Sequence, residues 1–60
     1  MLKENQDYII QPRTVTIGDI VFKQDEVIKV LELSPSTVKL LRYSTGEIII
    51  VDKRAIEIVV

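Results

Sequence analysis

The sequence predicts an all-β domain, a small barrel of five or six short antiparallel strands. Isoleucine and valine are abundant, and β-branched residues favour strands because they pack well on a pleated surface. Polar and turn-forming residues interrupt the apolar runs at intervals of roughly seven to eleven residues. No long segment repeats with the 3.6-residue period of an amphipathic helix. We therefore expect residues 1–60 to form one domain, with 1–13 as an N-terminal segment or edge strand and 14–60 as the barrel.

The first half of the chain predicts three strand-forming segments. Residues 14–23 form a strand or strand pair, which Gly18 and Asp19 interrupt with a kink, bulge or turn. Residues 26–33 form the next strand, after a short polar connection. Residues 7–12, which end at a proline, are expected to add an edge strand because proline cannot donate to a strand ladder.

The second half predicts two hairpin connections and a final break. Residues 37–44 form a strand after a loop in which Pro35 suits a type I turn, and this loop would place Glu32 opposite Lys39. Gly46 allows a positive φ in the next turn, before a strand at 47–51. Residues 52–55 then break the pattern over about one 3₁₀ turn, and residues 56–60 form the last strand.

Composition limits the chemistry of the chain. A domain of 60 residues buries only about 60% of the surface that its unfolded chain exposes, so dense aliphatic packing or self-association must stabilise it. The chain contains neither cysteine nor histidine, which excludes disulfides and the usual zinc ligands. We expect no metal and no cofactor. The only candidate acids and bases outside lysine and tyrosine are carboxylates such as Asp19, Asp25 and Glu26, which we interpret as solvated turn residues. The protein is therefore expected not to be an enzyme.

Charge and hydropathy indicate where the chain acts. The net charge is −1, so no strong electrostatic field draws the chain to nucleic acid or to an anionic membrane. The longest apolar run is four residues, which is too short to span a membrane, and the N-terminus lacks a hydrophobic signal segment. We expect a cytoplasmic protein.

Three stretches of the sequence resemble the SH3-like small β-barrel. They are "IGDIVF" (17–22), "VIKVLELSPSTVKLL" (27–41) and "TGEIIIVDKRAIEIV" (45–59), and the resemblance covers residues 15–60. Their wording is similar to KOW-type and Tudor-type modules of bacterial and phage proteins, without the glycine of the KOW core unit. The resemblance implies a barrel with a one-turn 3₁₀ break before the last strand. A phage or mobile-element origin would fit such a compact single-domain chain. Barrels of this kind bind nucleic acids or peptides, or serve in assembly.

Surplus aliphatic residues point to an interaction surface. Residues 40–41, 48–51 and 59–60 are apolar at consecutive positions, so both faces of their strands are apolar, whereas a small barrel has one interior. The N-terminal residues 7–10 cover the outer face, a partner covers it, or both do. We predict a non-enzymatic interaction or assembly module that binds a protein partner or itself as a homo-oligomer. The candidate interface residues are Leu41, Tyr43, Ile48, Ile50 and Val60.

Nucleic-acid binding is the alternative function. Five cations on neighbouring strands and in the break could approach one side of the barrel and contact phosphates. They are Lys29, Lys39, Arg42, Lys53 and Arg54. Acidic residues are interleaved with them, and the three aromatic residues offer little base stacking, because Phe22 is expected in the core.

Overall fold

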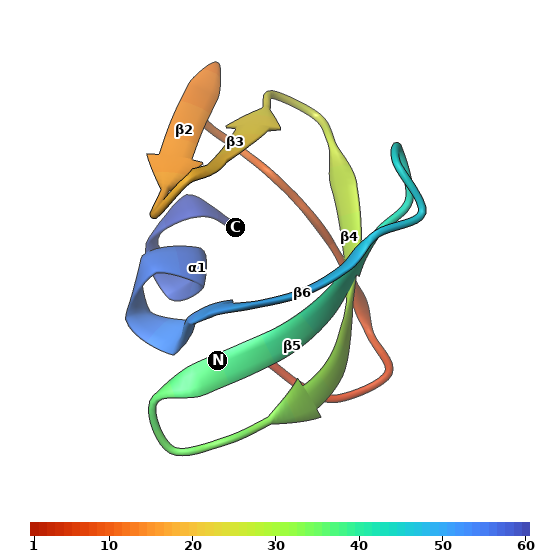
Figure 1. Cartoon of the computed structure of the whole chain (residues 1–60), viewed down its shortest axis with the longest axis vertical. Helices are drawn as coiled ribbons and strands as arrows, with labels where there is room; N and C mark the ends of the chain where they lie inside the picture. The colour runs from red at the N-terminus through yellow and green to blue at the C-terminus, as the bar shows by residue number, and fades with distance from the viewer.

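The chain folds into two antiparallel sheets and one short helix. The computed structural model describes residues 1–60. The larger sheet has the order β1-β4-β5-β6, with β1 at Asp7–Ile9, β4 at Val27–Leu33, β5 at Thr37–Arg42 and β6 at Ile48–Asp52 (Figure 1). The smaller sheet pairs β2 (Thr14–Ile17) with β3 (Ile20–Lys23), and the chain ends in helix α1 (Lys53–Val59). The predicted predominance of antiparallel strands is confirmed.

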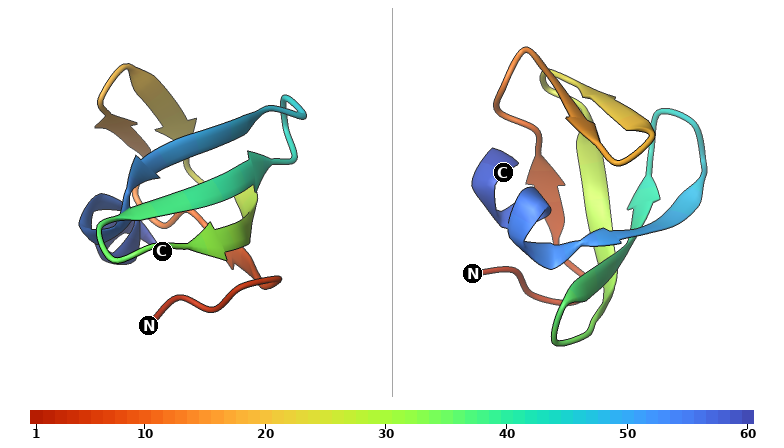
Figure 2. Two further views of the ribbon diagram at one scale, coloured as in Figure 1. Left: turned by 60° about the horizontal axis from the view of Figure 1, so that its bottom comes forward. Right: turned by 60° about the vertical axis from the view of Figure 1, so that its left-hand side comes forward.

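The two sheets do not close into a barrel. β2 and β3 pair only with each other, while β1 and β6 form the two edges of the larger sheet. Figures 1 and 2 show the larger sheet curving around an interior that the β2–β3 hairpin and α1 cover. The single helix has seven residues and is too short to cross a membrane.

Alternating side chains of the strands build the core. In β4 and β5, every second residue points inward, and the same face receives Phe22 from β3 and Val51 from β6. Phe22 is fully buried, as predicted. The complete cluster of buried apolar residues is Leu2, Ile10, Phe22, Ile28, Val30, Val38, Leu40, Val51, Ile56 and Val59.

Turn chemistry fixes the hairpin registers. Gly18 is the first residue of the two-residue loop between β2 and β3, and its φ of +61° is what a type II′ turn requires there. Glu32 lies opposite Lys39 in the β4–β5 pair, as predicted, although a register shift between Val30 and Glu32 marks a bulge just before it.

The N-terminal segment completes the core rather than covering the outer face. β1 pairs antiparallel with β4, which confirms the predicted edge strand. Leu2 and Ile10 are buried in the core cluster. Ile48 and Ile50 nevertheless remain exposed on the opposite face of the sheet. The N-terminal segment is therefore not the cover that these two residues lack.

The C-terminal residues form a helix, and the predicted 3₁₀ break and last strand at 56–60 are wrong. Asp52 caps the helix, because its Oδ1 accepts a hydrogen bond of 2.9 Å from the backbone N–H of Arg54. Ile56 and Val59, three residues apart, share the buried side of α1, whereas Ile58 is 82% exposed. The cap and this spacing outweigh the β-propensity of the isoleucines and valines.

Candidate protein-binding surface

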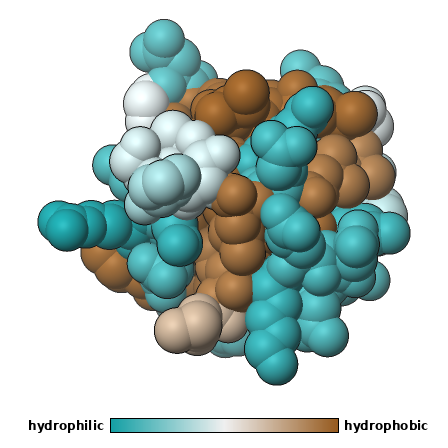
Figure 3. Space-filling view, turned by 90° about the horizontal axis from the view of Figure 1, so that it is seen from below, coloured by the Kyte–Doolittle hydropathy of each residue, from teal (hydrophilic) through white to brown (hydrophobic).

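The face of the larger sheet that points away from the core carries an apolar patch. Opposed residues of paired strands share a face, and Leu41 lies opposite Ile48. Ile48 is 58% exposed and Ile50 is 65% exposed, while Leu41 is half-buried. Tyr43, just after β5, is 49% exposed. We call Leu41, Tyr43, Ile48 and Ile50 the outer patch. Seen from below, apolar surface runs between hydrophilic side chains (Figure 3).

A hydrogen bond fixes the tyrosine of the outer patch. The hydroxyl of Tyr43 donates to Oδ1 of Asp7 over 2.8 Å, so its side chain reaches across β4 to β1. This hydrogen bond to Asp7 raises the pKa of Tyr43, because loss of the proton would place a phenolate against a carboxylate. The aromatic ring is therefore held in a defined position on the surface.

Val60 lies apart from the other predicted interface residues. It follows α1, where its backbone N–H donates to the carbonyl of Ile56, and its side chain packs against the core. Its surface neighbours are Leu2, Tyr8 and Glu57. The predicted final strand, which would carry Val60, is absent, because helix α1 occupies this part of the chain. The structure thus brings together four of the five predicted residues.

β6 also leaves one edge of its backbone unpaired. The N–H of Arg42 donates to the carbonyl of Glu47 over 2.8 Å, and the N–H of Lys53 donates to the carbonyl of Ser36 over 3.0 Å. Hydrogen-bonded pairs alternate along an antiparallel ladder, so the backbone groups of Ile48, Ile50 and Asp52 point away from β5. These are also the residues whose side chains face outward.

A shallow groove runs beside this free edge. Its volume is about 330 Å³, and it separates β6 from the tip of the β2–β3 hairpin. No backbone hydrogen bond joins the hairpin to β6. The lining residues are Ile17, Gly18, Asp19, Ile20, Ile50, Val51 and Asp52.

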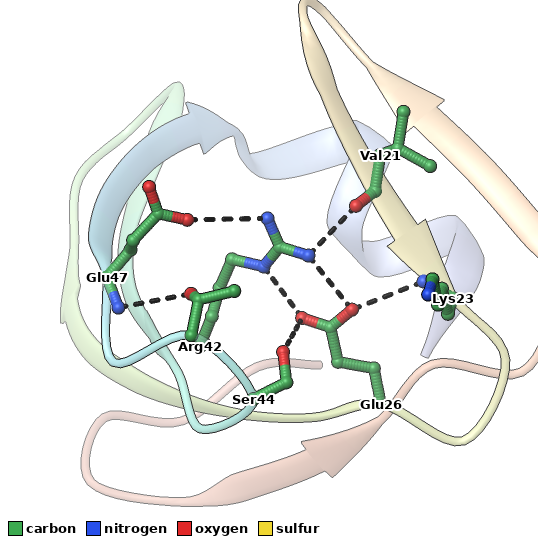
Figure 4. A network of polar contacts seen from close by, with 7 residues as sticks. Val21, Lys23, Glu26, Arg42, Ser44 and Glu47 are labelled. Atoms are coloured by element: carbon green, nitrogen blue, oxygen red, sulfur yellow. Dashed lines mark hydrogen bonds and ion pairs between the residues drawn. The ribbon is translucent and has the colours of Figure 1, made fainter.

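A network of charged and polar side chains, centred on Glu26 and Arg42, lies at one end of the interior. Nε of Arg42 lies 2.7 Å from Oε2 of Glu26, and Nη2 lies 3.0 Å from Oε1, which makes the contact bidentate (Figure 4). Nη2 also donates to the carbonyl of Val21 over 2.9 Å. The guanidinium stacks 4.8 Å above the centre of the Phe22 ring.

The same network satisfies the carboxylate of Glu26. The backbone N–H of Lys23 and the hydroxyl of Ser44 each donate to it over 3.2 Å. The hydrogen bonds from Arg42, more than any other contact, hold the pKa of Glu26 below its ordinary value. The interpretation of Glu26 as a solvated turn residue is wrong. A signal for its burial was present, because Glu26 has the same strand parity as the core residues Ile28 and Val30.

The structure does not bring the five candidate phosphate-binding cations together. Arg42 points inward and is bound to Glu26, so its guanidinium is not free to contact a phosphate. Lys29 and Lys39 lie on the outer side of the sheet, opposite Asp7 and Glu32 respectively. Lys53 and Arg54 begin α1, where Lys53 is half-buried and Arg54 is exposed. No cluster of three or more acidic side chains is arranged to hold a metal ion.

The chain matches no protein-family model, no curated protein and no solved structure.

Proposed function

We propose that this protein is a non-enzymatic interaction module that binds a protein partner, or a second copy of itself, through the outer patch. The observation that carries the proposal is the exposure of Ile48 and Ile50, which lie beside the half-buried Leu41 on the outer face of the larger sheet. Isolated exposed aliphatic residues are ordinary, but a contiguous group on one face of a sheet is typical of a binding surface. Tyr43 adds an anchored aromatic, the residue type enriched at interfaces.

The polar groups support binding rather than chemistry. The one buried ion pair, between Glu26 and Arg42, uses its hydrogen-bonding capacity within the protein. No buried side-chain nitrogen or oxygen lacks a partner. A catalytic acid or base needs access to substrate, and these two groups are held together by each other.

We further propose that the fold is an opened variant of the SH3-like small barrel, in which α1 takes the place of the last strand. The antiparallel order β1-β4-β5-β6, with the β2–β3 hairpin against the interior, supports this relation. The lack of cysteine fits a protein that works in the cytoplasm.

Site-specific photocrosslinking tests the proposed surface. A photoreactive amino acid replaces Ile48 in one variant and Ile58 in a matched control, and both are expressed in cells that carry the gene. Both positions are exposed, but Ile58 lies on α1, away from the outer patch. We expect a discrete adduct from position 48 and none from position 58. Absence of any adduct at 48, or equal adducts at both positions, would contradict the proposal.

A further inference from the structure

The free edge of β6 presents a template for one more strand. Ile48, Ile50 and Asp52 direct their N–H and C=O groups away from β5, and no other strand accepts them. The groove beside Ile50 lies between this edge and the tip of the β2–β3 hairpin, and no backbone hydrogen bond joins the two. Edge strands of this kind are usually blunted by proline, a bulge or an inward charge, and β6 has none of these between Ile48 and Val51.

The backbone groups of β6 can pair with those of a second copy that runs in the opposite direction. An antiparallel pairing of two copies centred on Ile50 aligns all five strand residues of each copy. It places Ile48 opposite Asp52 of the second copy, so every residue with free backbone groups meets another such residue. Each of these facing pairs exchanges two N–H···O=C hydrogen bonds.

The flanking charges favour the same register. With Ile50 opposite Ile50, Glu47 of one copy lies beside Lys53 of the other, and the two-fold axis repeats this contact. The carboxylate of Glu47 is accessible, since its side chain is 61% exposed and its distance to Nη1 of Arg42 is 3.7 Å. Opposite charges at both ends of a short strand specify a second copy more directly than they specify an unrelated extended peptide.

We infer that two copies of this chain pair antiparallel along β6, centred on Ile50, and join their four-stranded sheets into one continuous eight-stranded sheet. The pairing brings the Ile50 side chains of both copies together on the outer face and makes the two outer patches continuous. This inference rests on the proposed function and specifies its partner as the protein itself.

Charge reversal on each side of the pairing tests the register. Glu47→Lys places lysine beside lysine at both ends of its own dimer, and Lys53→Glu places glutamate beside glutamate. Each variant alone is expected to dissociate about tenfold more readily than the wild type. An equimolar mixture of the two variants restores both opposite-charge contacts, because each copy supplies what the other lacks. Sedimentation velocity over a range of protein concentrations measures all three samples, with Glu57→Lys, an exposed residue on α1, as the matched charge control.

A proline at the centre of β6 tests the backbone hydrogen bonds. The N–H of Ile50 makes no bond to β5, so Ile50→Pro removes a donor that points to the free edge and takes no hydrogen bond from the β5–β6 pairing. We expect this variant to keep its far-UV circular dichroism and to lose self-association. If it does not fold, the mixture of charge variants still decides the question.

The outcomes separate this inference from the proposed function. A wild-type protein that stays monomeric to millimolar concentration, or a mixture that associates no better than its components, overturns the pairing. If position 48 crosslinks to a protein of a different mass while the purified chain is monomeric, the outer patch remains an interaction surface and the self-pairing is wrong. If purified wild-type protein dimerises and the mixture recovers the dimer, the pairing is supported, whether or not position 48 also crosslinks to another protein in cells.

Discussion

The carboxylate of Glu26 and the guanidinium of Arg42 meet at 2.7 Å at one end of the interior, where their side chains are 4% and 12% exposed. Glu26 precedes β4 and Arg42 ends β5, and both also bind the backbone of β3, at Lys23 and Val21. The pair therefore links the β2–β3 hairpin to the larger sheet. The hairpin makes no strand pairing with that sheet, so these polar contacts position it together with Phe22.

Removing the charge of Glu26 should destabilise the protein substantially. Glu26→Gln leaves the shape of the side chain but deprives Arg42 of its counter-ion, and breaking such a pair costs about 3 kcal/mol. Chemical denaturation measures the free energy of unfolding of both proteins at neutral pH. Glu47→Gln is the control, since Glu47 is exposed and its contact with Arg42 is longer; its effect should stay below about 0.5 kcal/mol. Equal effects of the two substitutions would contradict the assigned role of Glu26.

The same pair predicts how stability depends on acid. The pKa of Glu26 is lower in the folded protein than in the unfolded chain, so its contribution is complete above the unfolded-state value and is lost as pH falls through the lowered value. Unfolding measured from about pH 6 down to about pH 2 should show a steeper loss of stability for the wild type than for Glu26→Gln. If the two proteins lose stability in parallel as pH falls, another carboxyl group causes the acid dependence.

Two isoleucines distinguish the helix from the predicted final strand. In a strand, Ile56 and Ile58 would lie on the same face and respond alike to truncation. In α1, Ile56 is fully buried and Ile58 is exposed. We expect Ile56→Ala to lower the free energy of unfolding by about 2–5 kcal/mol and Ile58→Ala to change it by less than about 0.5 kcal/mol. Similar losses of stability at both positions would favour the predicted strand over the helix.

A neighbouring pair tests the role of the N-terminal segment. Ile10 is fully buried in the core cluster, and its backbone N–H donates to the carbonyl of Glu26, whereas Ile9 is 49% exposed. Ile10→Ala should cost about 2–5 kcal/mol, and Ile9→Ala much less. Deletion of residues 1–11 should therefore destabilise the chain strongly. A truncated protein with an unchanged melting temperature would show that the segment is dispensable to the core.

Local sequence patterns were sufficient for most of the strands. Gly18, Pro35 and the apolar segments between them predicted the hairpins, and the short loop predicted the pairing of Glu32 with Lys39. The pattern failed for α1 because its Ile and Val content favours a strand. The information that decides the matter is the capping aspartate and the three-residue spacing of Ile56 and Val59.

The sequence showed which residues are candidates for the surface but not which of them face outward. Residues 48–51 are all apolar, so alternation could not indicate which of them face the core. The register with β5 decides this: Val51 lies opposite the buried Val38, which turns Ile48 and Ile50 outward. The Glu26–Arg42 contact joins residues 16 positions apart in the sequence, and no local motif marks such a partner. It depends on how the hairpin packs against the sheet.

The last prediction concerns the alternative function, nucleic-acid binding. We expect the protein not to be retained on single- or double-stranded oligonucleotides at low salt, because Arg42 is bound to Glu26 and the net charge is −1.

If binding to oligonucleotides occurs through the remaining cations, its affinity must fall as salt rises, with a logarithmic slope of roughly −0.7 to −0.9 per phosphate contact. The double variant Lys53→Glu, Arg54→Glu should then abolish that binding while the thermal unfolding curve stays unchanged, since glutamate is well tolerated in the first turn of α1. The apolar contacts of the outer patch behave differently, because they persist or strengthen as salt rises. Only the Glu47–Lys53 contacts of the inferred dimer weaken with salt. Salt-sensitive retention that this double variant abolishes would therefore favour the nucleic-acid function over the outer patch.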